Sequence, residues 1–417
     1  MRPPPSARLR ESLARLKAPL TAVLVIAGVL SVSAPASARP YWKTRIDRIA
    51  AGKQIGIVVH DEGRTLYTHA HRVKRAPASN ENLLMSMALF EQLDPATRIE
   101  TRAFVATQPI ARVIAGDLWI TGRGDPTITA GAPYGRSLPF PATKLGALAR
   151  SIAGIVDRID GRVMANTGYF EHDWFAPGWK ENFPSDEVAL PSALTFEGNA
   201  RKGNHIRDPE LRAARAMTQK LESMGVSVAG RPGAAQMPSN RTLVATTESR
   251  PLATLVRYMN RNSSNFFAEV LGKRLGVAAA EAPGTIAKGA SAIEDFAARL
   301  GVELTAHDSS GLSYRNRVSP AGIVKLLTHV EDSAGYYEVL RRGLPTGGQG
   351  TLEERLGGVR IRAKTGSLDG VSALSGWLWL KRTGSWAEFS ILSSGMYYWT
   401  AKGVEDRIVR VLTDLAR

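Results

Sequence analysis

Three short polar segments of the chain contain residue types that could carry out acyl transfer. Ser79 lies at the start of an apolar helical pattern, in the segment PASNENLL. The segment NSSN, residues 262–265, precedes the apolar run FFAEVLG, and the segment KTGS, residues 364–367, precedes a strongly β-forming run. Each segment alone is a weak signal, because such short patterns arise often by chance and usually form ordinary caps or turns. The order and spacing of the three segments together are a stronger indication of acyl transfer than any one segment alone.

Each segment supplies a group with a definite chemical use. A serine at a helix N-terminus lies close to backbone N–H groups, which can bind a developing oxyanion. Ser263 offers a hydroxyl for proton relay, and Asn265 offers an amide that can hold a substrate amide. Lys364 and Thr365 offer a cation and a hydroxyl to a substrate carboxylate, and Gly366 lets a substrate backbone approach the strand. Together these groups suit acyl transfer on a peptide that has a free C-terminal carboxylate.

Two elements near the N-terminus are predicted to position Ser79. Residues 54–60 and 64–71 are β-rich runs joined by a D-E-G turn, which predicts a β-hairpin. The helix that begins at Ser79 is apolar on nearly all sides, so we expect it to be buried. This helix is predicted to end at Asp94-Pro95.

The C-terminal part of the chain predicts a second hairpin and a closing helix. Residues 371–381 and 386–395 are strand-like and flank an R-T-G-S turn, and residues 403–415 have a helical pattern. Upstream of these, helices are predicted over four ranges, with Ser319 as the N-cap of the last: 251–259, 266–275, 284–300 and 320–331.

The middle of the chain, residues 98–246, has a different pattern. Short strand-like runs alternate there with Gly/Pro turns, and one helix is predicted over residues 144–155. We therefore expect an α/β (α+β) protein in which residues 39–97 and 247–417 form one domain. Residues 98–246 are then one or two units inserted into that domain.

Composition and charge exclude several classes of protein. The chain of 417 residues has no cysteine, which rules out thiol catalysis, thiolate metal sites and disulfides. The formal net charge of +16 favours anionic surroundings. The basic residues are scattered and form no nucleic-acid-binding motif. We therefore expect no nucleic-acid partner, and either peripheral contact with an anionic wall or membrane or a surface that is merely solubilising.

The N-terminus has the pattern of a signal peptide. Basic residues between Arg2 and Lys17 precede an apolar run over residues 20–30, and Ala36-Ser37-Ala38 offers a cleavage site. The predicted mature protein begins near Arg39 and is periplasmic or otherwise exported. Residues 1–38 hold five basic side chains and one acidic side chain, so the mature chain keeps a charge of +12. An uncleaved anchor is the alternative interpretation.

Several longer segments, taken with the three polar ones, resemble one family of penicillin-binding proteins. This family is the low-molecular-mass D-alanyl-D-alanine carboxypeptidase/endopeptidase group, peptidase family S13 or the penicillin-binding protein 4 type. The resemblance runs from about Ile55 to the C-terminus. It is carried by seven segments in the family's order: PASNENLL, GDLWITGRGDPTIT, LPSALTFEGN, MNRNSSNFFAEVLGKRLG, DSSGLSYRNRVSP, GGQGTL and RAKTGSLDGVSALSGW.

The resemblance implies a fold and a set of catalytic residues. The fold would be a penicillin-binding or β-lactamase-like transpeptidase domain, with an antiparallel sheet flanked by helices and a β-rich insertion. Ser79 would be the nucleophile that forms an acyl-enzyme, and Ser263 would relay a proton to the leaving D-alanine. Lys364 would be the third catalytic residue, with Ser79 and Ser263. The backbone N–H groups of Ser79 and Ser367 would form the oxyanion hole.

The resemblance also implies how the substrate is held. Asn265 would bind the substrate amide, Lys364 and Thr365 would bind the terminal carboxylate, and Gly366 and Ser367 would complete the binding strand. Residues 308–313 would line the cleft. The expected partners are the peptidoglycan stem peptide and β-lactams, without a metal or other cofactor, and the oligomeric state is left open.

Asn82 departs from the family at a position of chemical importance. The family's first motif is Ser-x-x-Lys, in which the lysine takes the proton of the serine. Asparagine has no basic nitrogen, and loss of a general base typically costs about 10²- to 10⁴-fold in rate. Glu81 is rotated off the face of Ser79, and Lys74 would have to fold back over the turn. By analogy with the family, Lys364 is the best placed substitute, although it would then serve two functions, and a carboxylate from the inserted region is the other candidate.

Two hypotheses follow from this departure. The chain is either a working but impaired carboxypeptidase/endopeptidase, or a degenerate family member that binds peptidoglycan or a partner without turnover. A serine β-lactamase would share the cleft but would normally lack so long an insertion. Triad hydrolases are disfavoured, because the chain has no G-x-S-x-G elbow.

Overall fold

The computed structural model of the protein describes residues 40–131, 133–201, 204–333 and 335–414. The predicted signal peptide, residues 1–38, lies outside the described residues. Among the residues described, no helix is both long enough and apolar enough to cross a lipid bilayer.

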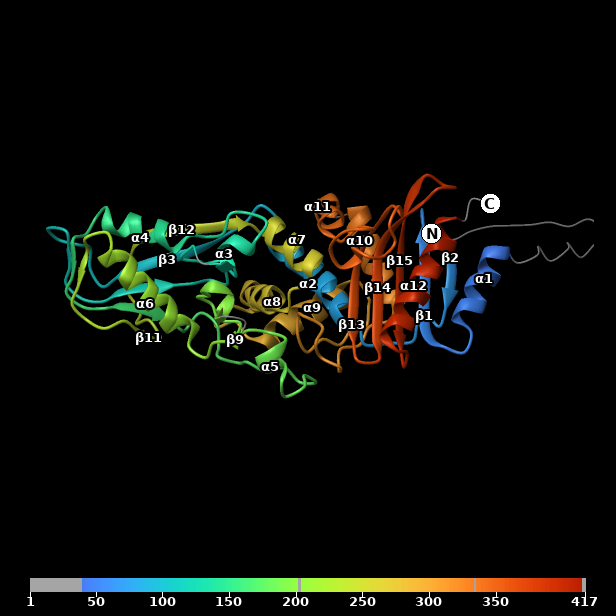
Figure 1. Cartoon of the computed structure of the whole chain (residues 1–417), viewed down its shortest axis with the longest axis horizontal. Coiled ribbons are helices and arrows are strands. Elements are labelled where there is room, and N and C mark those ends of the chain that lie inside the picture. Colours follow the sequence, from blue (N-terminus) through green and yellow to red (C-terminus); the bar gives the residue numbers. More distant parts are fainter. Residues whose placement is uncertain (1–39, 132, 202–203, 334, 415–417) are drawn as a thin grey trace, which may run out of the picture. The chain divides into compact units, whose positions relative to one another are not determined.

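Strands from the two ends of the described chain pair in one antiparallel sheet (Figure 1). Its strand order is β13-β14-β15-β1-β2. Ile57 of β1 lies opposite Ile391 of β15, where the two ends meet. Both predicted hairpins are confirmed. The strands are β1 (Gln54–Asp61), β2 (Arg64–His69), β13 (Ile361–Leu368), β14 (Val371–Leu380) and β15 (Ser385–Ser394).

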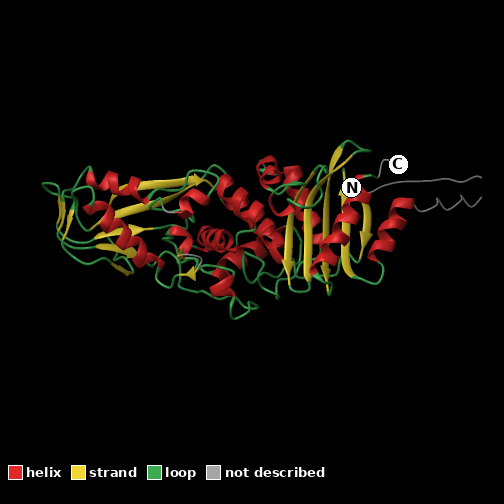
Figure 2. Ribbon diagram, viewed as in Figure 1, coloured by secondary structure: helices red, strands yellow, loops and turns green. Residues whose placement is uncertain are grey.

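Side chains of this sheet alternate between two hydrophobic cores. In β14, Ala373 belongs to one core and Leu374 belongs to the other, because successive side chains of a strand point to opposite faces. Helices α1 (Tyr41–Ala50) and α12 (Tyr398–Thr413) cover the core that holds Leu374. Helix α10 (Pro320–Ser333) covers the opposite face of the sheet. The sheet is thus flanked by helices on both faces (Figure 2).

The helix that follows Ser79 is buried among other helices. A short 3₁₀ turn, η1 (Ala78–Asn80), leads into α2 (Glu81–Gln92). Every residue from Glu81 to Phe90 is buried, which confirms the predicted burial on all sides. The neighbours of α2 are α7 (Leu252–Asn262), α8 (Asn265–Ala280) and α9 (Ile286–Arg299), and α11 (Tyr337–Gly343) packs against α7.

The intervening residues build separate sheets of their own. A mixed sheet has the order β11-β7-β5-β3-β12, a parallel sheet has the order β10-β6-β4, and β8 pairs with β9. The strands are β3 (Arg98–Val105), β4 (Val113–Ile114), β5 (Leu118–Thr121), β6 (Arg158–Ile159), β7 (Val163–Asn166), β8 (Ala200–Arg201), β9 (Asn204–His205), β10 (Ser227–Val228), β11 (Gly233–Ala235) and β12 (Thr242–Pro251). The helices here are α3 (Pro133–Ser137), α4 (Leu145–Ala153), α5 (Phe183–Asp186), α6 (Pro209–Glu222) and η2 (Glu197–Asn199); η3 (Gly350–Leu352) lies before β13.

Most predicted helices are confirmed, with shifted ends. The Ser319 hydroxyl accepts a hydrogen bond from the Gly322 nitrogen at 3.0 Å, as expected of an N-cap. The closing helix begins at Tyr398 rather than at residue 403, because Ala401 and Lys402 of the extra turn are buried against the rest of the fold. No pattern predicted α1 or α6.

Candidate active site

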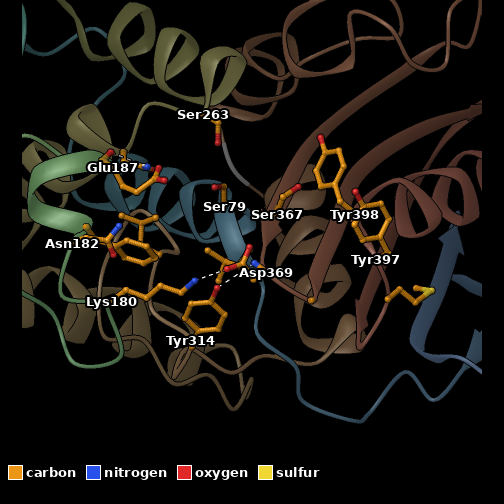
Figure 3. A pocket seen from close by; sticks show the side chains of 16 residues that line it. Ser79, Lys180, Asn182, Glu187, Ser263, Tyr314, Ser367, Asp369, Tyr397 and Tyr398 are labelled. Atoms are coloured by element: carbon orange, nitrogen blue, oxygen red, sulfur yellow. Dashed lines mark hydrogen bonds and ion pairs between the residues drawn. The ribbon is translucent and has the colours of Figure 1, made fainter. Parts of the chain in front are cut away.

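Three serines from distant parts of the chain line one pocket of about 650 Å³. Ser79 lies in η1, Ser263 lies between α7 and α8, and Ser367 lies in β13. Ser263 points toward Ser79, and Ser367 lies beside Ser79 (Figure 3). The fold therefore brings together residues from all three polar segments of the sequence.

The turn that carries Ser79 is held on the edge of strand β13. Ala78 and Asn80 are buried, so Ser79 is the residue of η1 that reaches the pocket. The side-chain amide of Asn80 donates a hydrogen bond from Nδ2 to the backbone carbonyl of Lys364 at 2.9 Å. Because both groups are buried, breaking this bond would leave a polar group unpaired. The bond therefore fixes Ser79 relative to the KTGS segment.

Two glycines allow backbone segments to approach this turn closely. A Cβ atom at Gly366 would lie 2.7 Å from the Pro77 carbonyl oxygen and 3.0 Å from the Ser79 nitrogen. A Cβ atom at Gly311 would lie 1.9 Å from the Ala78 carbonyl oxygen, and Gly311 has a φ of +81°. Gly366 therefore makes room for the protein's own turn, whereas the sequence suggested that it makes room for a substrate.

Ser263 joins two helices in a left-handed backbone conformation. It caps α7 with φ 52° and ψ 44°, a region that residues other than glycine seldom occupy. The next residue, Ser264, is the N-cap of α8, and its hydroxyl accepts a hydrogen bond from the Phe267 nitrogen. This reversal between the helices directs the Ser263 side chain toward the pocket, and backbone strain of this kind is common at functional sites.

The amine of Lys364 lies behind Ser263, away from solvent. Its Nζ contacts the Ser263 hydroxyl at 2.9 Å and donates to the Thr365 carbonyl at 2.7 Å. Burial, and then the charge of Lys402, lower the pKa of the Lys364 amine to about 7. An amine with this pKa is neutral in a large fraction of molecules at neutral pH. The neutral amine can accept a proton, as a general base must.

Lys402 on α12 is a second buried amine, and no sequence motif indicated its presence here. Its Nζ donates to the Gly366 carbonyl at 2.8 Å and to the Ser372 hydroxyl at 2.9 Å, and it lies 3.8 Å from the Glu405 carboxylate. These contacts place a cation against the strand that carries Lys364. The Lys402 charge therefore favours the neutral form of the Lys364 amine.

Asn82 lies about one helical turn after Ser79, at the position to which the sequence resemblance assigned a lysine. Its side chain is fully buried, and neither its amide nitrogen nor its amide oxygen has a hydrogen-bond partner among the described residues. Its backbone carbonyl accepts a hydrogen bond from the Ser86 hydroxyl at 2.6 Å. The Asn82 amide supplies no basic nitrogen beside Ser79.

Buried carboxyl groups gather near the start of α2. Glu81 Oε2 lies 3.4 Å from Asn316 Nδ2, which also donates to Asp308 at 2.7 Å. Burial, followed by the charges of Asp308 and Glu269, raises the pKa of Glu81 well above its ordinary value. The same burial and neighbouring charges that raise this pKa disfavour the ionised form of Glu81.

The segment of residues 308–313 supports the pocket more than it lines it. Asp308 is fully buried and accepts hydrogen bonds from Trp179 Nε1 at 2.7 Å and from the Ser313 nitrogen at 2.8 Å. Leu312 does line the pocket. The expectation that the whole segment lines the cleft is wrong for Asp308 and Ser313, because both side chains are fully buried and hydrogen-bonded to other parts of the protein, Asp308 to Trp179 and Ser313 to the Pro177 carbonyl.

The other predicted binding residues differ in their access to the pocket. Asn265 lines it, and its Nδ2 donates to the Glu187 carbonyl at 3.1 Å. Thr365 is buried, and its hydroxyl donates to the Thr351 hydroxyl at 2.7 Å. Among the described residues, no group of three or more histidine or carboxylate side chains could hold a metal ion.

The pocket is also bordered by charged and aromatic residues that sequence reasoning missed. Lys180 forms an ion pair with Asp369, whose backbone nitrogen donates to the Tyr314 hydroxyl at 3.1 Å (Figure 3). Tyr397 and Tyr398 form another part of the wall. No pattern in the sequence linked Asp369 to Lys180.

The chain is similar to known proteins of one family. The model of the D-Ala-D-Ala carboxypeptidase 3 (S13) family matches residues 44–202 and 193–415. The chain is 26% identical over 397 residues to carboxypeptidase DacB of Mycolicibacterium smegmatis, covering 88% of this chain and 82% of that protein. It is also 26% identical over 468 residues to a D-alanyl-D-alanine carboxypeptidase of Actinomadura sp., covering 89% and 83%.

Solved structures show the same fold. Penicillin binding protein 4 (DacB) from Haemophilus influenzae superposes with a TM-score of 0.72 at 18% sequence identity, covering 89% of this chain and 98% of that chain. A structure of that protein complexed with a novel β-lactam superposes with a TM-score of 0.66. The predicted fold class, a mixed α/β protein with an antiparallel sheet flanked by helices, is confirmed.

We predict that Gly311→Ala weakens the packing of the Ser79 turn. The added Cβ would overlap the Ala78 carbonyl oxygen and occupy a left-handed backbone position, so the free energy of unfolding should fall by about 2–4 kcal/mol. Urea denaturation measures this change. Gly357→Ala is the matched control, because a Cβ there meets no atom within 4 Å. Equal stability of the two variants would contradict the close packing.

Proposed function

The chain belongs to the D-Ala-D-Ala carboxypeptidase 3 (S13) family, and from this premise we propose that it is an exported serine-type D-Ala-D-Ala carboxypeptidase or endopeptidase of peptidoglycan stem peptides. The family relatives named above are carboxypeptidases, which are hydrolases. The pocket supports the proposal because it holds Ser79, Ser263 and Ser367 within reach of one small substrate.

The proposed reaction begins with attack by Ser79. Its Oγ forms a bond to the carbonyl carbon of the penultimate D-alanine, and the peptide bond to the terminal D-alanine breaks. The hydroxyl proton passes through Ser263 to the neutral amine of Lys364, which returns a proton through Ser263 to the leaving amine. Backbone N–H groups of Ser79 and Ser367 bind the oxyanion. Water then hydrolyses the acyl-enzyme and restores the serine.

The contact between Lys364 and Ser263 is the observation that carries this proposal. The distance of 2.9 Å is that of a hydrogen bond, and the buried amine has a pKa of about 7. Lys364 can therefore serve as base without a lysine at position 82. A Lys364 that acts as base is less available to bind the substrate carboxylate as a cation.

Slow turnover is part of the proposal. In the Ser-x-x-Lys arrangement the amine contacts the nucleophile directly, whereas Lys364 contacts Ser263. A relay through a second hydroxyl needs more groups in the correct geometry at once, which lowers the rate. We therefore expect acylation of Ser79 to be slow but measurable.

Binding without turnover is the second candidate function. The observation that favours it is Asn82, whose buried amide has no hydrogen-bond partner among the described residues and cannot accept a proton. The same pocket would then hold a stem peptide or a β-lactam, and Ser79 would remain unmodified. The two candidates differ in one measurable quantity, the rate of acylation.

Two further parts of the proposal concern location and domains. Residues 1–38 have the pattern of a signal peptide, and peptidoglycan lies outside the cytoplasm, so we propose that the protein is exported before it functions.

We also propose that residues 98–246 form an inserted domain. Strands β3 to β12 pair with one another and not with the sheet that contains β13, which supports this division.

We predict that Asn82→Lys increases the rate at which fluorescent penicillin labels Ser79, by about 10²-fold or more. The new amine would restore a base in direct reach of the serine. Asn82→Met is the matched control, because it fills similar space without a basic nitrogen, and Ser79→Ala should abolish labelling. Labelling of the native protein as fast as that of Asn82→Lys would contradict the assigned impairment.

We predict that labelling of the native protein becomes faster as the pH rises through about 7, because Lys364 must lose its proton to act as base. Lys402→Met removes a neighbouring positive charge, so it should raise the pKa of Lys364 and move the midpoint of the profile to higher pH.

Two control variants accompany this pH profile. Lys402→Arg keeps the charge and should keep the midpoint near that of the native protein, and Lys381→Met removes an exposed lysine and should change nothing. If Lys402→Met left the midpoint unchanged, the electrostatic role of Lys402 would be wrong.

A further inference from the structure

A second cavity, of about 460 Å³, lies along α7, and the proposed reaction does not use it. Its walls come from α7, from α11 and from the loop that contains Phe140. Helices α7 and α11 pack against each other (Figure 1). The cavity includes Asn262, the residue before Ser263. One residue of its wall is thus next to Ser263 in the sequence. The residues that line this cavity are nevertheless different from those that line the serine pocket.

Arginines give this cavity a strong positive charge. Arg257, Arg261 and Arg342 line it. Burial, and then the charges of Arg257 and Arg362, lower the pKa of Arg261. Among the described residues, one carboxylate forms an ion pair with an arginine of the cavity wall. It is Glu338, which lies 2.7 Å from Arg342. The positive charge is therefore incompletely balanced.

Two arginines, one that lines the cavity and one beside it, are held in place by contacts with the protein. Arg261 donates from Nη2 to the Arg342 carbonyl at 3.1 Å, and its Nε is buried without a hydrogen-bond partner among the described residues. Arg341, beside the cavity, stacks on the Trp386 ring with 4.5 Å between its guanidinium carbon and the ring centroid. A cation held in advance loses less conformational entropy when it binds an anion.

Aromatic and apolar side chains form the rest of the wall. Phe140 and Tyr258 contact each other edge to face, with 5.7 Å between their ring centroids, and both line the cavity with Val339. Tyr258 also packs on Phe267, which is buried in the core. The cavity therefore combines a rigid apolar wall with several guanidinium groups, a composition typical of small-ligand sites.

We propose that this cavity binds a phosphate monoester that carries a small apolar group. Its phosphate contacts Arg257, Arg261 and Arg342, and its apolar group lies against Phe140 and Tyr258. Guanidinium groups match phosphate oxygens in pairs of parallel hydrogen bonds. The cavity has several guanidinium groups and one protein carboxylate, Glu338, nearby, so its net charge is positive. A dianionic ligand neutralises this charge better than a monoanionic ligand does, and we therefore choose a phosphate over a carboxylate ligand.

Titration of phenyl phosphate by calorimetry tests the proposal on the native protein. Phenol lacks the anion, inorganic phosphate lacks the apolar group, and benzoate carries a single charge, so each should bind at least about tenfold more weakly than phenyl phosphate. Benzoate binding equal to that of phenyl phosphate would overturn the choice of phosphate. Phenyl phosphate binding no tighter than that of phenol would overturn the anion site.

Substitutions locate the binding in this cavity. The double variant Arg257→Ala and Arg342→Ala should weaken phenyl phosphate binding about tenfold or more. Both side chains are exposed, so the fold should tolerate the change. The double variant Arg382→Ala and Arg410→Ala removes the same charge from exposed positions outside the cavity and should bind as the native protein does. Equal weakening in both double variants would show only a general effect of charge and would contradict the site.

A vesicle experiment distinguishes the source of the phosphate. Phosphatidic acid presents the same monoester on a membrane, whereas phenyl phosphate presents it in solution. If the protein binds these vesicles and the Arg257 and Arg342 substitutions abolish the binding, the ligand is a lipid headgroup. If the protein binds phenyl phosphate but does not bind the vesicles, the ligand is a soluble ester. Neither assay depends on Ser79, so failure of the proposed reaction leaves this test intact.

Discussion

The contact between the Ser79 turn and strand β13 is the constraint on which the site depends. The Asn80 side chain holds the Lys364 carbonyl at 2.9 Å, while the absence of side chains at Gly366 and Gly311 lets both flanking segments reach the turn. The turn comes from the N-terminal part of the chain and the strand from the C-terminal part. The antiparallel pairing of β1 with β15 brings these two parts into one sheet. Both the fold and the site therefore require that the N-terminal and C-terminal parts of the chain pair.

Burial then sets the protonation of the groups around the turn. Taking a group out of water disfavours its charged form, so burial lowers the pKa of the Lys364 amine and raises that of the Glu81 carboxyl. The charge of Lys402 acts on Lys364 in the same direction. Both Lys364 and Glu81 are thus drawn toward neutrality, but only the amine gains the capacity to accept a proton. With Asn82 near the nucleophile, the candidate base of the proposed reaction is Lys364, which contacts Ser263.

The sequence predicted the elements better than their tertiary contacts. Both hairpins and the buried helix after Ser79 follow from local periodicity and turn residues, and these predictions are confirmed. Membership of the family follows from the order of seven segments. Lys402 was missed because its role depends on α12 packing against β14, and no local pattern encodes that contact. The resemblance placed Asp308 in the cleft wall, but its carboxylate is buried and accepts a hydrogen bond from Trp179, a residue of the intervening segment, and no local pattern encodes that contact.

The protonation of Lys364 is the most direct test of this account. Nuclear magnetic resonance of protein labelled with ¹³C at the lysine ε-carbon can follow each amine as the pH changes, and Lys364→Arg identifies the signal. The account predicts that Lys364 titrates with a midpoint near 7 in the folded protein. A midpoint near the ordinary lysine value of about 10.4 would show that the amine stays charged at neutral pH, and it would contradict the role of Lys364 as the base.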